Sequence, residues 1–175
     1  MFEDQRLQGT THDLQQMTDA MRSEREMLDL IVETAQADDR IRAVIMNGSR
    51  ANPNAPRDIF QDFDVVYMVT DVAPFSNNLQ WIKRFGELMI LQMPEAMQDP
   101  PPSEDGGFAY LMQFMDGNRI DLGIYPLSKL SERAHDSLSV LLLDKDGIVR
   151  YGWITEDPTV EPDYSRIEQS LAEID

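Results

Sequence analysis

Two aspartates that stand one residue apart, Asp62 and Asp64, are the strongest chemical feature of this sequence. They stand at the start of an apolar run, residues 65–69, whose composition is typical of a β-strand. Alternate residues of a strand share a face, so the two carboxylates are expected to point the same way, about 6–7 Å apart along the strand. Carboxylate oxygens are the ligands that Mg2+ and Ca2+ prefer in proteins. The pair therefore predicts a site for a divalent cation that carries a phosphate.

A polar turn precedes this pair. The tetrapeptide Asn47-Gly48-Ser49-Arg50 directly follows the apolar run 41–46. Gly48 allows a backbone approach that a side chain would block, and the serine hydroxyl and backbone N–H groups can donate to phosphate oxygens. Arg50 can add positive charge. A Gly-Ser pair by itself is more often an ordinary turn, but beside two aspartates it predicts a phosphate-binding corner.

A third aspartate, Asp121, falls in the middle of another predicted strand. Apolar runs at 108–115 and 118–125 flank Asp116-Gly117, a dipeptide typical of hairpin turns. Asp121 faces away from its apolar neighbours, and a charge in such a place needs a partner or a metal. Three carboxylates on two strands could hold one or two ions. Two ions could hold the attacking and leaving oxygens of a phosphoryl displacement. The competing interpretation, in which Asp62 begins a strand and Asp64 is a surface residue, is weakened by the upstream turn and by Asp121.

Composition favours one folded domain and restricts its partners. The chain has 175 residues, 42% of them hydrophobic, and no cysteine. No apolar run reaches the length needed to span a bilayer, and the polar N-terminus is unlike a signal peptide, so a cytoplasmic location is expected. The formal net charge of −17 repels nucleic acid and anionic lipid, so neither is expected as a partner, and it favours a cationic one.

The remaining elements must position the aspartates. Ser23 and Glu26 have the spacing of a capping box and predict a helix over 23–38. Strands are predicted at 41–46 and 62–69, with a proline-broken loop, 50–61, between them. The spacing predicts a second helix over 76–92, a loop over 94–107, a short helix at 128–135, and strands at 139–143 and 148–153. The buried face of the second helix is expected to consist of Trp81, Ile82, Phe85, Leu88 and Met89. This order indicates an α/β or α+β domain with a mixed β-sheet.

Gly48-Ser49, Asp62-x-Asp64 and Asp121 together resemble the signature of the nucleotidyltransferase superfamily. Longer segments, at 27–31, 40–50, 58–64, 116–122 and 142–146, resemble the aminoglycoside 6-adenylyltransferases, which modify streptomycin. The resemblance covers about residues 22–147. It implies the nucleotidyltransferase fold, a mixed β-sheet flanked by helices.

The resemblance also implies an activity, the transfer of AMP from ATP to a hydroxyl of an aminoglycoside such as streptomycin, with Mg2+ required and pyrophosphate leaving. By position, Asp62 and Asp64 would be metal ligands, and Asp121 would complete the metal site or help to deprotonate the attacking hydroxyl. The segment 47–50 (Asn47, Gly48, Ser49 and Arg50) would hold the phosphates. The acidic charge of the chain suits a polycationic drug.

The expected domain organisation is an N-terminal extension (1–21), a catalytic domain (22–150) and a tail with a short helix (151–175). The resemblance implies a helical C-terminal domain that supplies much of the drug pocket, and that domain is expected to be missing here. Two alternatives therefore stay open. One is a stand-alone nucleotidyltransferase that adenylylates a partner protein, as in toxin–antitoxin pairs. The other is a nucleotide-binding module without turnover. A protein partner or an oligomer is left open with them.

Overall fold

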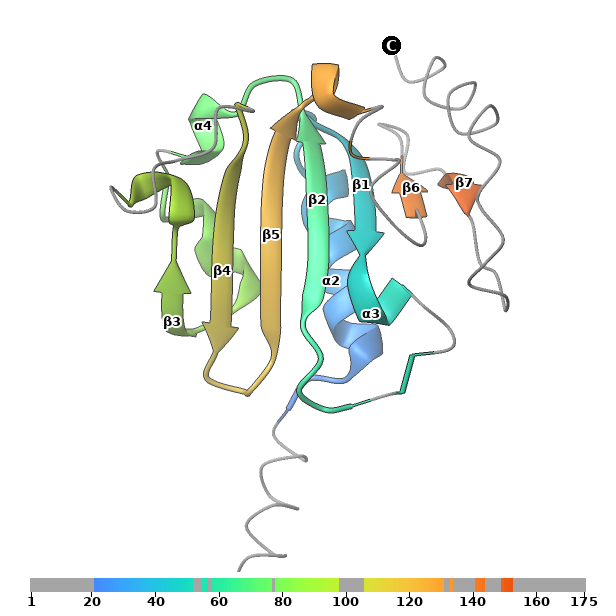
Figure 1. The fold of residues 1–175 in the computed structure, drawn as a ribbon, viewed down its shortest axis with the longest axis vertical. Helices are drawn as coiled ribbons and strands as arrows, with labels where there is room; N and C mark the ends of the chain where they lie inside the picture. The colour runs from blue at the N-terminus through green and yellow to red at the C-terminus, as the bar shows by residue number, and fades with distance from the viewer. Residues whose placement is uncertain are drawn as a thin grey trace, which may run out of the picture.

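Five strands form one mixed β-sheet in the computed structural model, which describes residues 21–51, 55–56, 58–76, 78–97, 106–130, 133, 141–143 and 149–152 (Figure 1). Their order across the sheet is β1-β2-β5-β4-β3. The central pair, β2 and β5, is parallel, and the other three pairings are antiparallel. The bounds are β1 (Ile41–Asn47), β2 (Phe63–Val69), β3 (Leu88–Gln92), β4 (Phe108–Phe114) and β5 (Arg119–Pro126). The mixed sheet expected from the sequence is confirmed.

Helix α2 (Glu24–Gln36) covers one face of this sheet (Figure 1). It begins as predicted, because Ser23 and Glu26 form a reciprocal capping box. Met27 and Ile31 of the helix are buried against the sheet, and the Tyr67 hydroxyl of β2 donates to the Ile31 carbonyl at 2.6 Å. This face therefore holds the main hydrophobic core.

The opposite face of the sheet, which we call the open face, carries the polar side chains. Along β5, Ile120, Leu122 and Ile124 are fully buried on the core side, while Asp121 and Tyr125 alternate with them. The alternation predicted for this strand is confirmed. A second, smaller apolar cluster stabilises the open face and contains Ala43, Ile45, Val66, Met68 and Leu130, with Tyr125 and Leu127 packed against it.

The predicted hairpin between β4 and β5 is also confirmed, and it is tied to the start of α2. Gly117 adopts a left-handed φ of 90° in the turn. Arg22 donates to the Asp116 carboxylate, and the Asn118 amide donates to the Arg22 carbonyl at 3.0 Å. Burial of Asp116 opposes ionisation, but hydrogen bonds from Arg22 and Asn118 outweigh it and lower the pKa of Asp116 to about 2.

The helix predicted over 76–92 is wrong. The segment forms a 3-10 helix, η1 (Trp81–Phe85), and then strand β3, which pairs with β4. Gly86, at φ 136°, ends the 3-10 helix and redirects the chain. Trp81, Ile82 and Phe85 are buried as expected, but Met89 is 53% exposed, so a single helical face does not exist here. Ser76, the residue at which that helix was predicted to begin, is instead the last residue of the short helix α4 (Ala73–Ser76).

The other elements are short. Helix α3 (Gly48–Ala51) occupies the predicted Gly-Ser turn. The 94–107 loop contains a 3-10 turn, η2 (Pro94–Ala96). Where the helix 128–135 was predicted, a 3-10 turn, η3 (Leu127–Lys129), comes first, and Leu130 and Arg133 are α-helical; the other residues of that range lie outside the described part of the chain. Strands β6 (Leu141–Leu143) and β7 (Val149–Gly152) form a separate pair, with β6 beside β1 (Figure 1).

The predicted extension at 1–21, apart from its last residue, and the predicted helix in the 151–175 tail lie outside the described residues. Among the described helices, none is both long and apolar enough to cross a membrane.

Candidate functional site

Strand register brings the predicted site residues into one row on the open face. Asn47 of β1 is paired with Asp64 of β2, and Asp64 is paired with Asp121 of β5. Asp62 directly precedes β2. One carboxylate oxygen from each of Asp62, Asp64 and Asp121 lies within 4.8 Å of the others. The three aspartates that the sequence singled out therefore form one cluster, here called the carboxylate cluster.

The backbone of Gly48 lies against the carboxylate cluster. Its φ of +71° is left-handed, and a Cβ at this position would lie 1.9 Å from Oδ2 of Asp64. The backbone of the Gly-Ser turn thus approaches the carboxylate as closely as only glycine allows. The close approach predicted for Gly48 is present, and its neighbour is the Asp64 side chain.

The carboxylates of the cluster repel one another. Burial raises the pKa of Asp64, and the negative charges of Asp62 and Asp121 raise it further, while Arg119 partly lowers it. Like charges are held together here by the strand register, so a cation would relieve their repulsion.

Arg119 is a site residue that the sequence interpretation missed. It forms a two-pronged ion pair with Asp121, Nε to Oδ1 at 2.8 Å and Nη2 to Oδ2 at 2.6 Å. Its Nε also lies 3.9 Å from Asp62. A signal existed, because Arg119 stands two residues before Asp121 and therefore shares its face of the strand. Arg119 is the cluster's own counter-charge.

Arg50 is held against Phe63 and against the backbone that leads into β2. Its guanidinium stacks on the Phe63 ring, 3.9 Å from the centroid, and donates to the carbonyls of Gln61 and Asp62. The side chain is 8% exposed and faces Glu24. These contacts fix the backbone that carries Asp62, and the expectation that Arg50 also holds phosphates stays a prediction.

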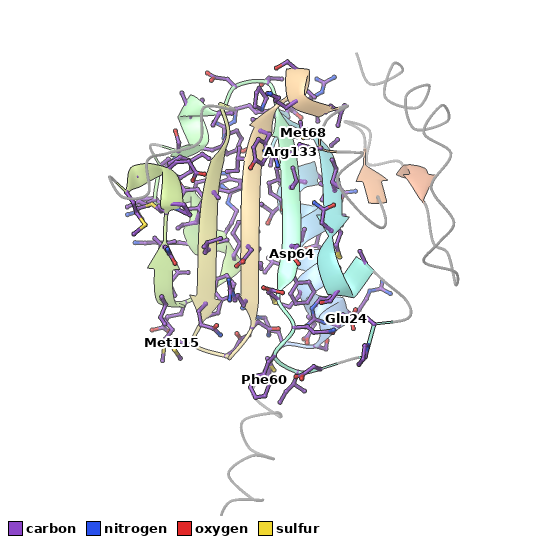
Figure 2. All side chains as sticks on the ribbon, in the orientation of Figure 1. Glu24, Phe60, Asp64, Met68, Met115 and Arg133 are labelled. Carbon is purple, nitrogen blue, oxygen red and sulfur yellow. The ribbon has the colours of Figure 1, made fainter. Side chains whose placement is uncertain are left out.

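An open pocket of about 360 Å³ adjoins the carboxylate cluster on the open face. Asn47, Gly48, Asp64 and Asp121 belong to its lining; Ser49 is half-buried next to Gly48. At the far end the lining includes Tyr125 and Arg133, which the sequence interpretation also missed. Figure 2 labels Asp64 at mid-sheet and Arg133 toward the upper end of the same strands.

The donor set of the cluster fits a divalent cation. It offers only carboxylate oxygens, the donors that Mg2+ and Ca2+ prefer, and they are close enough to share one ion. The Asp64 carboxylate occupies the space that a side chain at position 48 would take. The residues therefore suit a hard cation next to a pocket that could take a larger anion.

The fold defines the class of this protein. The chain matches the crystal structure of an aminoglycoside 6-adenyltransferase from Bacillus subtilis with a TM-score of 0.59 and 36% sequence identity, over 75% of this chain and 44% of that one. The five-stranded sheet with its carboxylate cluster is thus a nucleotidyltransferase fold.

Sequence comparison gives the family. Residues 21–164 match the family model described as streptomycin adenylyltransferase. Aminoglycoside 6-adenylyltransferases from Bacillus subtilis (strain 168) and Campylobacter jejuni are 44% and 48% identical over 133 and 127 residues, which are 75% and 72% of this chain. The chain belongs to the streptomycin adenylyltransferase family. It spans about half the length of these relatives, 47% and 44%.

Proposed function

We propose that this chain carries the catalytic half of an aminoglycoside adenylyltransferase, which transfers AMP from ATP to a drug hydroxyl. The observation that carries the proposal is the carboxylate cluster, with oxygens within 4.8 Å of one another beside an open pocket. The chain belongs to the streptomycin adenylyltransferase family, and the relatives it is similar to are named aminoglycoside 6-adenylyltransferases. Both facts support this choice of reaction.

In the proposed reaction, the hydroxyl oxygen of the acceptor attacks the α-phosphorus of ATP. The bond from that phosphorus to the bridging oxygen breaks, and pyrophosphate leaves with the electron pair. Asp62 and Asp64 would hold Mg2+, with Asp121 completing the set. Bound there, Mg2+ would neutralise charge on the reacting phosphate. We assign to Asp121 the further role of accepting the hydroxyl proton.

The chain's own residues prepare this site. Gly48 and Asn47 border the pocket next to Asp64, which supports their contact with a phosphate through backbone N–H groups and the side-chain amide. Ser49 follows in α3 and is proposed to add its hydroxyl. Arg50 holds the Asp62 carbonyl at 3.0 Å and so fixes the approach to the cluster.

The formal net charge of −17 supports a polycationic acceptor such as streptomycin. Arg119 neutralises part of the cluster and lies at its edge, so it would limit how closely a second cation could approach Asp121. The drug's own ammonium and guanidinium groups are therefore expected to bind acidic groups outside the cluster.

Pyrophosphate release tests the proposal. The chain is incubated with ATP and Mg2+, with streptomycin or with an aminoglycoside that lacks the acceptor hydroxyl as control. Release that needs both Mg2+ and streptomycin, and that disappears in Asp62→Asn, is expected. Release that is equal in Asp62→Asn, or that does not depend on the drug, would contradict the proposal.

A further inference from the structure

We propose that Arg133, stacked on the ring of Tyr125, binds the β- and γ-phosphates of ATP and then the departing pyrophosphate. This inference rests on the proposed adenylyl transfer and assigns a residue to it. The Arg50 guanidinium already donates to backbone carbonyls and stacks on Phe63, so a second arginine is considered for the phosphates.

The pocket beside the cluster is lined by charges of opposite sign. Asp64, Asp121 and Arg133 all belong to its lining, and Figure 2 shows Arg133 toward the upper end of the sheet, away from Asp64. Among the described residues that line this pocket, Arg133 is the one with a positive charge. A triphosphate carries more negative charge than one divalent cation can balance, so a second cationic contact is needed. Arginine suits this contact because its planar fork matches phosphate oxygens.

The position of Arg133 is set by an aromatic platform. Its Cζ lies 3.8 Å from the centroid of the Tyr125 ring. The ring in turn lies directly over two glycines: a Cβ would fall 2.1 Å from Cε1 of Tyr125 at Gly107 and 2.7 Å from Cε2 at Gly123. Any larger residue at either position would displace the ring. A guanidinium stacked by its face keeps its N–H groups in the plane, where they can donate sideways to an anion.

The spacing suits a nucleotide whose α-phosphate lies at the cluster. Asp121 and Tyr125 share the open face of β5, and the ring lies back over Gly123, two residues or about 7 Å from Asp121. Phosphates attached to that α-phosphate would therefore extend toward the platform. When the bond to the α-phosphorus breaks, the bridging oxygen gains charge, and N–H donation from Arg133 would stabilise it.

Binding measurements with different nucleotides test this assignment. Calorimetry with Mg2+ gives the Kd of ATP, pyrophosphate and AMP for the wild type, Arg133→Gln and Arg84→Gln. Arg84 is the matched control, because it also stacks on a ring, 4.8 Å from the Trp81 centroid, yet lies outside the pocket lining. Arg133→Gln is expected to weaken ATP and pyrophosphate about 10- to 100-fold, the range of a charged hydrogen bond, and AMP less than about 2-fold. Arg84→Gln should change none of them.

Further variants keep the test decisive. Arg133→Lys retains the charge but loses the planar fork, so it is expected to recover only part of the lost ATP affinity. Tyr125→Leu, which removes the platform, should weaken ATP but not AMP. Equal losses for ATP and AMP, or an unchanged Kd for ATP in Arg133→Gln, would overturn the inference while leaving the proposed function in place. A wild-type chain that binds neither ATP nor pyrophosphate with Mg2+ would overturn both.

Discussion

Replacing Gly48 by alanine should separate the geometry of the carboxylate cluster from the stability of the fold. The new Cβ would lie 1.9 Å from Oδ2 of Asp64, about 1.5 Å short of ordinary contact at 3.4 Å. Metal–oxygen distances tolerate shifts of only about 0.2 Å, so the displaced carboxylate can no longer share an ion with Asp62. We expect Mn2+ affinity, measured by calorimetry in the presence of ATP, to fall at least about tenfold, which corresponds to about 1.4 kcal/mol.

Gly106 provides the matched control. Its φ of +76° is close to the +71° of Gly48, but nothing lies within 4 Å of its virtual Cβ. Alanine is strained at a left-handed φ, so both variants should lose about 1–2 kcal/mol of unfolding free energy. For a chain of this size, that loss lowers the Tm by roughly 2–8 °C. Only Gly48→Ala should also lose metal affinity. Equal Mn2+ affinity in the two variants would refute the role assigned to this close approach.

Three further perturbations follow from the structure. Asp116→Asn should lower the free energy of unfolding in urea by about 1–2 kcal/mol at pH 7. The folded protein holds the pKa of Asp116 at about 2, below its ordinary value, so the stability that the charged carboxylate contributes is complete above about pH 4 and should fade as the pH falls toward 2. A fixed difference across that range would count against the Arg22 pair as its source. Asp64→Asn should raise the Tm of the metal-free protein at pH 7, because the raised pKa means that the charged form destabilises the fold. That gain should shrink as the pH falls and the wild-type carboxyl becomes protonated, and a variant that melts lower at pH 7 would contradict it. Arg50→Gln should cost roughly 2 kcal/mol in unfolding free energy and weaken ATP and AMP equally; a loss confined to ATP would instead place Arg50 on the phosphates.

Residues on regular strands could be predicted from the sequence because strand periodicity is local. Asp62, Asp64 and Asp121 are brought together by alternation along β2 and β5 and by the parallel pairing of those strands. The Asp116-Gly117 turn also belongs to a short-range pattern. Local rules therefore predicted the shared face of the aspartates on each strand and the hairpin that presents Asp121, whereas the pairing that joins Asp64 to Asp121 is a long-range contact.

Arg50 and Arg133 could not be placed by the same rules. Arg50 bonds to carbonyls that lie 11 and 12 residues further along the chain, and Arg133 reaches the pocket by stacking on Tyr125. Both positions depend on tertiary packing. Local sequence patterns specify the charge of an arginine and leave open which anion or ring it meets.

The segment 76–92 shows a different limit. Its apolar residues satisfy a helical period, but the first three are buried by a 3-10 helix and the rest belong to an edge strand. Pairing with β4 supplies backbone hydrogen bonds to this strand, and the spacing of apolar residues carries no information about such pairing. Gly86, between the two elements, was the local signal against a continuous helix.

Transfer of the adenylyl group itself is the most direct test of the central claim. The wild type and Asp64→Asn are incubated with Mg2+, streptomycin and ATP labelled at the α-phosphate, and the labelled products are separated. The account predicts that the label moves to streptomycin with the wild type and stays on the nucleotide with Asp64→Asn. Label found on a protein in place of the drug, or transfer that is unchanged in Asp64→Asn, would contradict it.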